Sequence, residues 1–152
     1  MHRRGVLLVF AGVVLFGAGG CGGDGDGTLT HAELRAQADR ACRRAARAVQ
    51  EVGAPDPSDL DAAAKASRRV VSIQRRALVT LRRLEPPTDD EARYARWIAL
   101  VDQTLDQAEA SVEAQAAGDL GVADQANENG RLLDARADEI ASELGFSDCV
   151  GA

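Results

Sequence analysis

Hydrophobic and small residues recur every three or four positions in four successive stretches of the chain, and this spacing predicts four amphipathic helices. The first follows residues 30–33, where Thr and Glu stand three apart as in a capping box. It stops at the turn-rich "GAPDPS" of residues 53–58. The second begins near Ser58 and ends at Pro86-Pro87, because proline cannot continue a helix.

The third and fourth predicted helices are also bounded by recognisable signals. The third follows a second capping-box pattern at residues 88–91 and closes at Gly118. The fourth ends at Gly145, which we expect to be its C-cap. Within it, the "NENG" of residues 127–130 allows two readings. Asn-Gly is a turn signal that would break the helix, whereas a core-facing Gly130 would let a neighbouring helix approach closely.

The predicted inner faces are rich in alanine and leucine, and prolines, aromatic and β-branched residues are scarce, which favours helix. In chain order the inner positions are Leu34, Ala38, Cys42, Ala45, Val49, Val52, Leu60, Ala64, Val71, Leu78, Leu81, Leu84, Tyr94, Trp97, Val101, Leu105, Ala108, Val112, Ala123, Ala126, Leu133, Ala137, Ile140 and Leu144. Short connections place consecutive helices antiparallel. We therefore expect an all-α, up-down four-helix bundle over residues 30–152.

A different pattern precedes the helices. Two arginines near the start are followed by residues 5–20, which are apolar, uncharged and only 16 residues long. A membrane span needs about 20 apolar residues, so this pattern is typical of a secretory signal peptide. Residues 18–20, two glycines after Ala18, stand before Cys21 as in the lipobox of bacterial lipoproteins, although a lipobox usually has Leu where Ala18 stands.

We therefore expect residues 1–20 to be a lipoprotein signal peptide and Cys21 to carry diacylglycerol, which anchors the chain to the outer face of the bacterial cytoplasmic membrane. Residues 21–29, glycine-rich and acidic, would be a flexible tether. An ordinary secreted protein and an uncleaved N-terminal anchor are the alternatives. Two acyl chains suffice for stable anchoring, since each buried methylene contributes about 0.8 kcal/mol.

The expected export affects the oxidation state of the two remaining cysteines, Cys42 and Cys149. In an oxidising compartment an even pair is most simply a disulfide. The bundle topology brings the end of the last helix beside the start of the first, and the tail beyond it can fold back to Cys42, with Phe146 packed alongside. A bridge that closes a loop of roughly 100 residues stabilises by about 4.7 kcal/mol in the loop-entropy description. Two buried free thiols are the alternative.

Several motifs, in this order, resemble a family of small, uncharacterised actinobacterial lipoproteins. They are Ala38-Asp39-x-x-Cys42, Leu84-Glu85-Pro86-Pro87, Gly118-Asp119 and Leu144-Gly145-Phe146-x-x-Cys149. The resemblance spans nearly the whole chain after the signal. It implies an exported helical domain with a cysteine pair, and it implies no activity.

Charge divides the chain into two halves. Residues 28–87 carry 12 basic and 7 acidic side chains, and residues 88–152 carry 4 basic and 15 acidic ones. The basic half holds an arginine ladder with pairs at seven-residue spacing, which lie on one side of a helix: Arg68, Arg69, Arg75, Arg76, Arg82 and Arg83. We expect it to meet carboxylates of the acidic half. The alternative is contact with anionic lipid head groups. Nucleic acid is excluded by export, net acidity and few aromatic residues.

Patterns for cofactors and catalysis are missing from the sequence. There is no Glu-x-x-His pair, no C-x-x-C-H and no G-x-S-x-G. His31 is expected to be a solvated first-turn residue. The carboxylates four apart at Asp102 and Asp106 or Glu109 and Glu113 are expected to be solvated, and Tyr94 and Trp97 to pack in the core rather than line a pocket. We expect no cofactor and no enzyme.

The functional prediction is a non-enzymatic, lipid-anchored protein of the cell envelope that binds a partner or serves a structural role. The alternative is a module that binds a small ligand or lipid between its helices. A cavity of several hundred cubic ångströms lined by leucine and alanine would distinguish this alternative.

Overall fold

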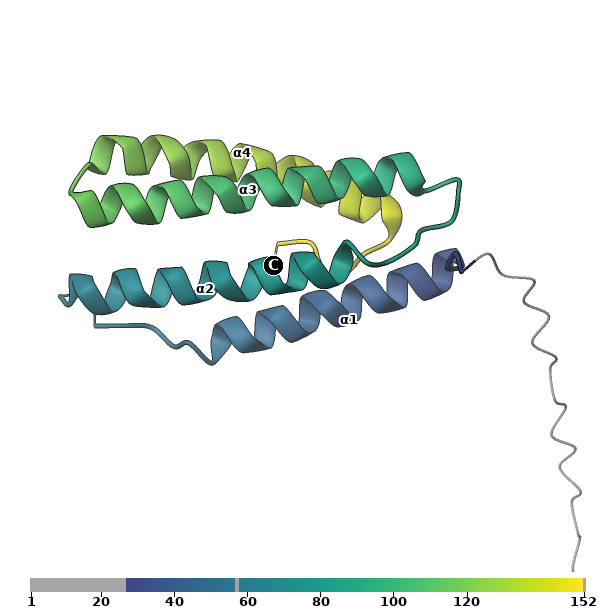
Figure 1. The fold of residues 1–152 in the computed structure, drawn as a ribbon, viewed down its shortest axis with the longest axis horizontal. Helices are drawn as coiled ribbons and strands as arrows, with labels where there is room; N and C mark the ends of the chain where they lie inside the picture. The colour runs from purple at the N-terminus through teal and green to yellow at the C-terminus, as the bar shows by residue number, and fades with distance from the viewer. Residues whose placement is uncertain (1–26, 57, 152) are drawn as a thin grey trace, which may run out of the picture.

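The computed structural model of the protein describes residues 27–56 and 58–151 (Figure 1). The described residues form four helices and no strand. The helices are α1 (His31–Gln50), α2 (Leu60–Leu81), α3 (Glu91–Ala117) and α4 (Leu120–Leu144). The predicted all-α, up-down four-helix bundle is confirmed.

The bundle consists of two antiparallel hairpins, α1–α2 and α3–α4, which lie side by side (Figure 1). The α3–α4 hairpin is packed most extensively, and α2 joins the hairpins by packing on α3. Direct packing between α1 and α4 is slight by comparison. After α4 the chain turns and returns between the hairpins (Figure 1), so the C-terminal tail takes part of the space that a fully closed bundle would give to α1 and α4.

The first helix start agrees with its sequence pattern, and the third does not. Thr30 and Glu33 form the predicted capping box, in which each side chain satisfies the other's backbone N–H. At α3 the predicted box is wrong. The N-cap is Asp90, and its side chain makes no capping hydrogen bond. The Asp90 carboxylate instead lies 2.6 Å from Nδ1 of His31 and 3.5 Å from Nη1 of Arg93, so it ties the start of α3 to the start of α1.

The helix ends agree with the sequence in α3 and α4. Both are closed by glycines with positive φ, Gly118 at 78° and Gly145 at 77°. A Cβ on Gly145 would also lie 2.7 Å from Cδ of Arg35, so the end of α4 meets the start of α1 closely. In contrast, α2 ends at Leu81, before Pro86, and Leu84 lies in the following turn, where it packs against the core.

The fourth helix is continuous through "NENG", so the break considered for it does not occur. Gly130 faces α3, where a Cβ would lie 3.4 Å from Cβ of Gln107 and 4.0 Å from the Thr104 carbonyl oxygen. These are ordinary van der Waals distances. The glycine therefore allows the close packing of α3 and α4, but alanine would also fit there.

Most of the predicted inner positions are in the core. Leu34, Ala38, Cys42, Val71, Leu78, Leu81, Tyr94, Trp97, Leu105, Val112, Ala123, Ala126, Ala137, Ile140 and Leu144 are buried. Ala45, Val49, Val52, Ala64, Leu84, Val101, Ala108 and Leu133 are half-buried. The side chain of Leu60 lies outside the described residues. Phe146, in the tail, is fully buried, so the tail belongs to the core.

Cys42 and Cys149 form the predicted disulfide, with their Cα atoms 5.2 Å apart and a separation of 107 positions in sequence. Further contacts fix the returning tail to α1. The Asp39 carboxylate accepts hydrogen bonds from the Asp148 backbone N–H at 2.9 Å and from the Ser147 hydroxyl at 3.3 Å. Arg43 forms an ion pair with Asp148. The tail is therefore held by covalent, hydrogen-bonded and ionic contacts within one short segment.

Candidate functional site

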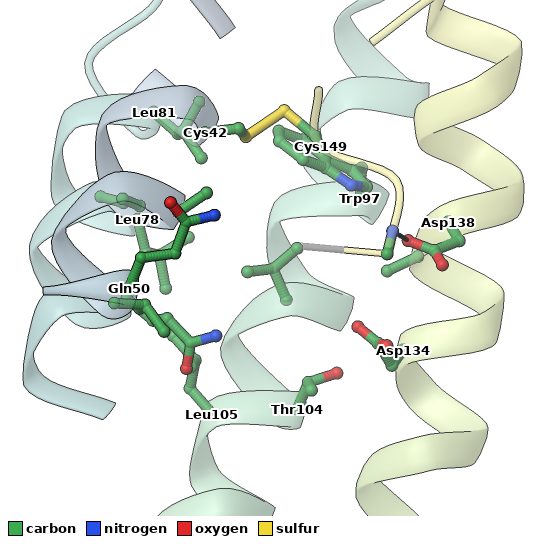
Figure 2. Close-up of a pocket in the computed structure, with 18 residues that line it drawn as sticks. Cys42, Gln50, Leu78, Leu81, Trp97, Thr104, Leu105, Asp134, Asp138 and Cys149 are labelled. Atoms are coloured by element: carbon green, nitrogen blue, oxygen red, sulfur yellow. Dashed lines mark hydrogen bonds between the residues drawn. A yellow bond between two sulfur atoms is a disulfide. The ribbon is translucent and has the colours of Figure 1, made fainter. Parts of the chain in front are cut away.

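A cavity of about 300 Å³ lies between the two hairpins, beside the disulfide (Figure 2). All four helices and the C-terminal tail contribute to its lining, which comprises 18 residues. Its size is at the lower end of the range of small-molecule pockets in proteins. The tail takes part in it through Cys149 and Gly151, which belong to the lining.

Most of the cavity wall is apolar. The side chains from α2 and α3 include Leu78, Trp97, Val101 and Leu105, and α1 adds alanines and Val49. Leu78, Trp97 and Leu105 are nearly inaccessible to solvent, at 2%, 2% and 4% exposed. The wall is therefore built of well-packed core side chains, and an apolar molecule that enters would be removed from water.

Aromatic rings support one end of the cavity. The ring centroids of Trp97 and Phe146 are 5.0 Å apart, and Tyr94 lies 5.6 Å from Trp97. The Tyr94 hydroxyl donates a 2.7 Å hydrogen bond to the Leu81 carbonyl oxygen at the end of α2, and burial raises the pKa of Tyr94. Tyr94 thus packs in the core as predicted, whereas Trp97 both packs in the core and lines the cavity.

The opposite wall is acidic. Asp134 and Asp138, one turn apart on α4, are the charged residues of the lining, which contains no arginine, lysine or histidine. Asp138 accepts a 3.0 Å hydrogen bond from the Gly151 backbone N–H (Figure 2). Burial, together with the neighbouring Asp138 charge, raises the pKa of the Asp134 carboxyl above its ordinary value. The cavity therefore joins an apolar wall to a patch of negative potential.

Other depressions lie on the described surface, and their linings differ. One of about 400 Å³ between α3 and α4 is bounded by charged side chains, among them Arg93, Arg136 and Glu143. Another of about 400 Å³ lies between α2 and α3, opens widely, and shares Gln74 with the cavity beside the disulfide. Of these sites, the cavity beside the disulfide is the one that combines a buried aromatic wall with convergent polar groups, as ligand sites commonly do.

The arginine ladder divides into two rows on α2. In one row, Arg75 contacts Asp102 at 2.7 Å, Glu109 at 2.9 Å, and Asp106, while Arg82 contacts Asp102 at 2.6 Å. Hydrogen bonds from Glu109 and Asp106 raise the pKa of Arg75. Asp102, Asp106 and Glu109, three of the four carboxylates expected to be solvated, thus form ion pairs between the hairpins. The fourth, Glu113, is exposed and has no ion pair among the described residues. Arg68, which begins this row, is exposed and has no ion pair among the described residues.

The second row, Arg69, Arg76 and Arg83, points outward and is exposed. Within residues 27–56 and 58–151 none of the three forms an ion pair, and Arg76 hydrogen-bonds to the Ser72 hydroxyl at 3.2 Å. In two of the three pairs, one arginine, Arg75 or Arg82, contacts carboxylates of α3 and its neighbour is exposed. In the first pair both arginines are exposed.

The remaining predictions concern His31, metals and the lipid anchor. His31 begins α1 and is exposed, as predicted, although it also contacts Asp90. The described part of the chain contains no group of three or more His, Cys, Asp or Glu side chains arranged to hold a metal ion. Cys21 and the predicted signal peptide lie outside the described residues. None of the helices that the structure describes is both long enough and apolar enough to cross a membrane.

Comparison of the chain with protein-family models, with curated proteins and with solved structures found no match. The function is therefore argued from the cavity and its surroundings alone. Sequence reasoning did not single out the two aspartates of its acidic wall. Spacing places Asp134 and Asp138 on one side of α4, and the sequence signal that distinguishes them is that Ala137, beside them, belongs to the predicted inner face.

Proposed function

We propose that this protein is an exported, lipid-anchored, non-enzymatic binding module that takes a small apolar molecule into the cavity between its hairpins. The observation that carries the proposal is the cavity of about 300 Å³ walled by Leu78, Trp97, Val101 and Leu105. An apolar ligand that fills such a space gains about 25 cal/mol for each Å² of apolar surface removed from water. No chemical step on the ligand is proposed.

The distribution of exposed hydrophobic side chains favours a cavity over a docking surface for a protein partner. The large exposed ones on α4 are Leu120, Val122 and Leu132. At about 100° per residue, Leu120 lies roughly 160° from Val122 and roughly 120° from Leu132 around the helix axis, and Val122 lies roughly 80° from Leu132. They do not form one stripe, and singly exposed apolar residues are normal on protein surfaces.

Trp97 provides the test, because it is the only tryptophan in the chain and lies in the cavity wall. The full chain carrying Cys21→Ser, which removes the proposed acylation site, is titrated with 1-octanol while tryptophan emission is recorded. We expect a saturable change in emission and a rise in melting temperature, since a ligand that binds only the folded state stabilises it.

A cavity-filling variant and a matched control locate the binding. Ala46 lines the cavity from α1, and leucine there adds three carbon atoms, about 90 Å³ if each takes the share of one water molecule. Ala46→Leu should weaken octanol binding at least tenfold, whereas Ala99→Leu, on the exposed side of α3, should leave it unchanged. The proposal is wrong if octanol does not bind saturably, or if Ala46→Leu binds it as well as the unsubstituted chain does.

The proposed location depends on residues 1–21 and needs its own experiment. Intact mass of the protein released from host membranes should correspond to a chain that begins at Cys21 and carries acyl mass. Cys21→Ser should remove the acyl mass from the protein. A native chain that begins at Met1, or a chain free of acyl mass in the culture fluid, would contradict the anchor.

A second candidate function is supported by the outward arginine row. Arg69 and Arg76 lie about 10 Å apart along α2 at 1.5 Å per residue, and Arg83 follows two positions after the end of the helix. The Leu29 backbone N–H donates a 2.8 Å hydrogen bond to the Glu85 carbonyl oxygen, so the segment that leads from the proposed anchor meets the bundle near the Arg83 end of the row. We propose that this row contacts anionic lipid head groups, each arginine contributing about 1 kcal/mol.

Charge reversal tests the lipid contact. Arg69, Arg76 and Arg83 are replaced together by Glu in the Cys21→Ser chain, and binding to liposomes with and without anionic lipid is measured. We expect the variant to lose the preference for anionic liposomes, and this preference to fall with added salt in the unsubstituted chain. Equal binding of the two proteins would exclude the contact and would leave the cavity proposal untouched.

A further inference from the structure

The side chains that line the cavity carry negative charge and no positive charge. Its 18 lining residues include two carboxylates, Asp134 and Asp138, and no basic side chain. The other three helices contribute only uncharged side chains to it, the polar ones being Gln50, Gln74 and Thr104. Thr104 already donates its hydroxyl to the Leu100 carbonyl oxygen at 3.0 Å. The unmatched charge in the cavity is therefore negative and comes from α4.

The two carboxylates differ in their partners. Asp138 accepts the Gly151 N–H at 3.0 Å, which fixes it beside the tail. Asp134 is half-buried, and in the part of the chain that the structure describes it has no hydrogen-bond or ion-pair partner. In Figure 2 its carboxylate lies on the cavity side of α4, across from Thr104.

A carboxylate that is partly removed from water without a partner is destabilised in its ionised form. The raised pKa of Asp134 agrees with this placement. A cation placed beside it would restore the lost stabilisation, because hydrogen bonds between charged groups are shorter and stronger than those between neutral ones. A ligand carboxylate in the same position would add a third negative charge.

The volume limits the size of the ligand. A cavity of about 300 Å³ corresponds to about ten water-sized volumes of roughly 30 Å³ each. An alkyl chain of about eight carbons with one polar head atom fits this space. The apolar side chains then face the alkyl chain, and α4 faces the head group.

We propose that the cavity binds an amphiphile with a cationic amino group, whose alkyl chain lies against Trp97 and Leu105 and whose ammonium lies between Asp134 and Asp138. This inference rests on the proposed function, because it names the ligand class of the same cavity. Asp134 forms the main ion pair with the ligand. Asp138, which is hydrogen-bonded to the tail, adds to the negative electrostatic potential around the ammonium.

Three probes of matched length test the inference by Trp97 emission: octylamine, 1-octanol and octanoate. We expect octylamine to bind about tenfold more tightly than octanol, the size of effect typical of a hydrogen bond to a charged group, and octanoate to bind more weakly than octanol. Asp134→Asn should abolish the preference for the amine and retain octanol binding. Asp124→Asn, a matched change at an exposed position of α4, should leave the preference intact.

Measuring at two pH values tests the same ion pair without a substitution. From pH 7 to pH 4 the preference for octylamine should shrink, because Asp134, whose pKa is raised by burial and by the neighbouring Asp138 charge, takes up a proton. The lining from α1, α2 and α3 contains no titratable side chain that could replace its charge. The inference is overturned if octylamine binds no more tightly than octanol at pH 7, or if the preference survives Asp134→Asn. If octanol itself fails to bind, it is the proposed function that fails.

Discussion

At the scale of single residues, the buried hydroxyl of Tyr94 links two helices. It donates to the carbonyl oxygen of Leu81, the last residue of α2. Tyr94 is 4% exposed, so this carbonyl has little access to water as a substitute partner. The hydrogen bond satisfies one of the four carbonyls that a helix end leaves without an intrahelical partner.

Tyr94→Phe should lower the free energy of unfolding by about 0.5–1.5 kcal/mol, because it removes this hydrogen bond while the ring packing remains. The Leu81 carbonyl oxygen keeps its 2.9 Å hydrogen bond from the Leu84 backbone N–H. Urea unfolding followed by circular dichroism measures the change. Ser72→Ala, which removes an exposed hydroxyl from α2, should change stability by less than about 0.5 kcal/mol. Equal effects of the two substitutions would contradict a role for the Tyr94 hydrogen bond.

Asp134 illustrates how a binding group reduces stability. Its raised pKa means that the folded state holds the proton more tightly than the unfolded state does. Stability therefore rises as pH falls through the folded-state pKa towards the unfolded value near 3.9, and above that window the ionised carboxylate destabilises the fold.

Asp134→Asn should accordingly raise the urea midpoint at pH 7. Its advantage over the unsubstituted chain should be lost by about pH 3.5, because the Asp134 carboxyl is then protonated in the folded and in the unfolded state. Asp124→Asn is the matched control at an exposed position of the same helix. A lower midpoint for Asp134→Asn at pH 7 would show that the carboxylate stabilises the fold. It would contradict the view that Asp134 is an unpartnered group available to a ligand.

At the scale of helices, the ion pairs between α2 and α3 determine how the hairpins meet. Arg75 contacts three carboxylates of α3 and is itself largely shielded from solvent, its side chain being 28% exposed. Removing it leaves Asp106 and Glu109 without a cation, whereas Asp102 keeps its ion pair with Arg82. Ion pairs on open surfaces contribute roughly 0–1 kcal/mol each, and networks contribute more.

Arg75→Ala should lower the free energy of unfolding by about 1–2 kcal/mol, and the loss should shrink in high salt because salt screens the exposed partners. Arg76→Ala is a close control, since the neighbouring arginine faces solvent on the same helix. Chemical unfolding at two salt concentrations measures both. If the two variants lose the same stability, the hairpin contact has no special role.

The helix boundaries show how far local sequence patterns can be trusted in this chain. Thr30 with Glu33 predicted a cap correctly, because nothing else competes for the two side chains. The equivalent pattern at Thr88 was wrong, since α3 starts at Glu91 with Asp90 as its N-cap, and the Asp90 carboxylate contacts His31, 59 residues away. That partner follows from the approach of α1 to α3, which local spacing does not contain.

At the scale of the whole molecule, the disulfide secures the tail that closes the cavity. Replacing Cys42 and Cys149 by Ser should cost up to about 4.7 kcal/mol in the loop-entropy description and should loosen the tail over the cavity. Melting temperature with and without reductant measures this. The unsubstituted chain should lose stability on reduction, whereas the Ser variant should not respond. An unchanged melting temperature on reduction would contradict the structural role of the bridge.

The sequence predicted the framework of this molecule better than its cavity. Periodicity identified the four helices and most of the core, and the cysteine pairing followed from export and topology. The cavity also depends on the path of the tail, which returns between the hairpins and adds Cys149 and Gly151 to the lining. Phe146 and Cys149 marked the tail, but nothing in the spacing of Asp134 and Asp138 showed that they would face an uncharged wall.

The most direct test of the account is to locate bound 1-octanol by nuclear Overhauser contacts in the isotope-labelled protein. Contacts from the octanol methylenes to the Trp97 ring and to the methyl groups of Val101 and Leu105 are the result that a ligand cavity between the hairpins predicts. Contacts confined to the exposed side chains of Leu120 and Leu132, or no specific contacts at all, would contradict it.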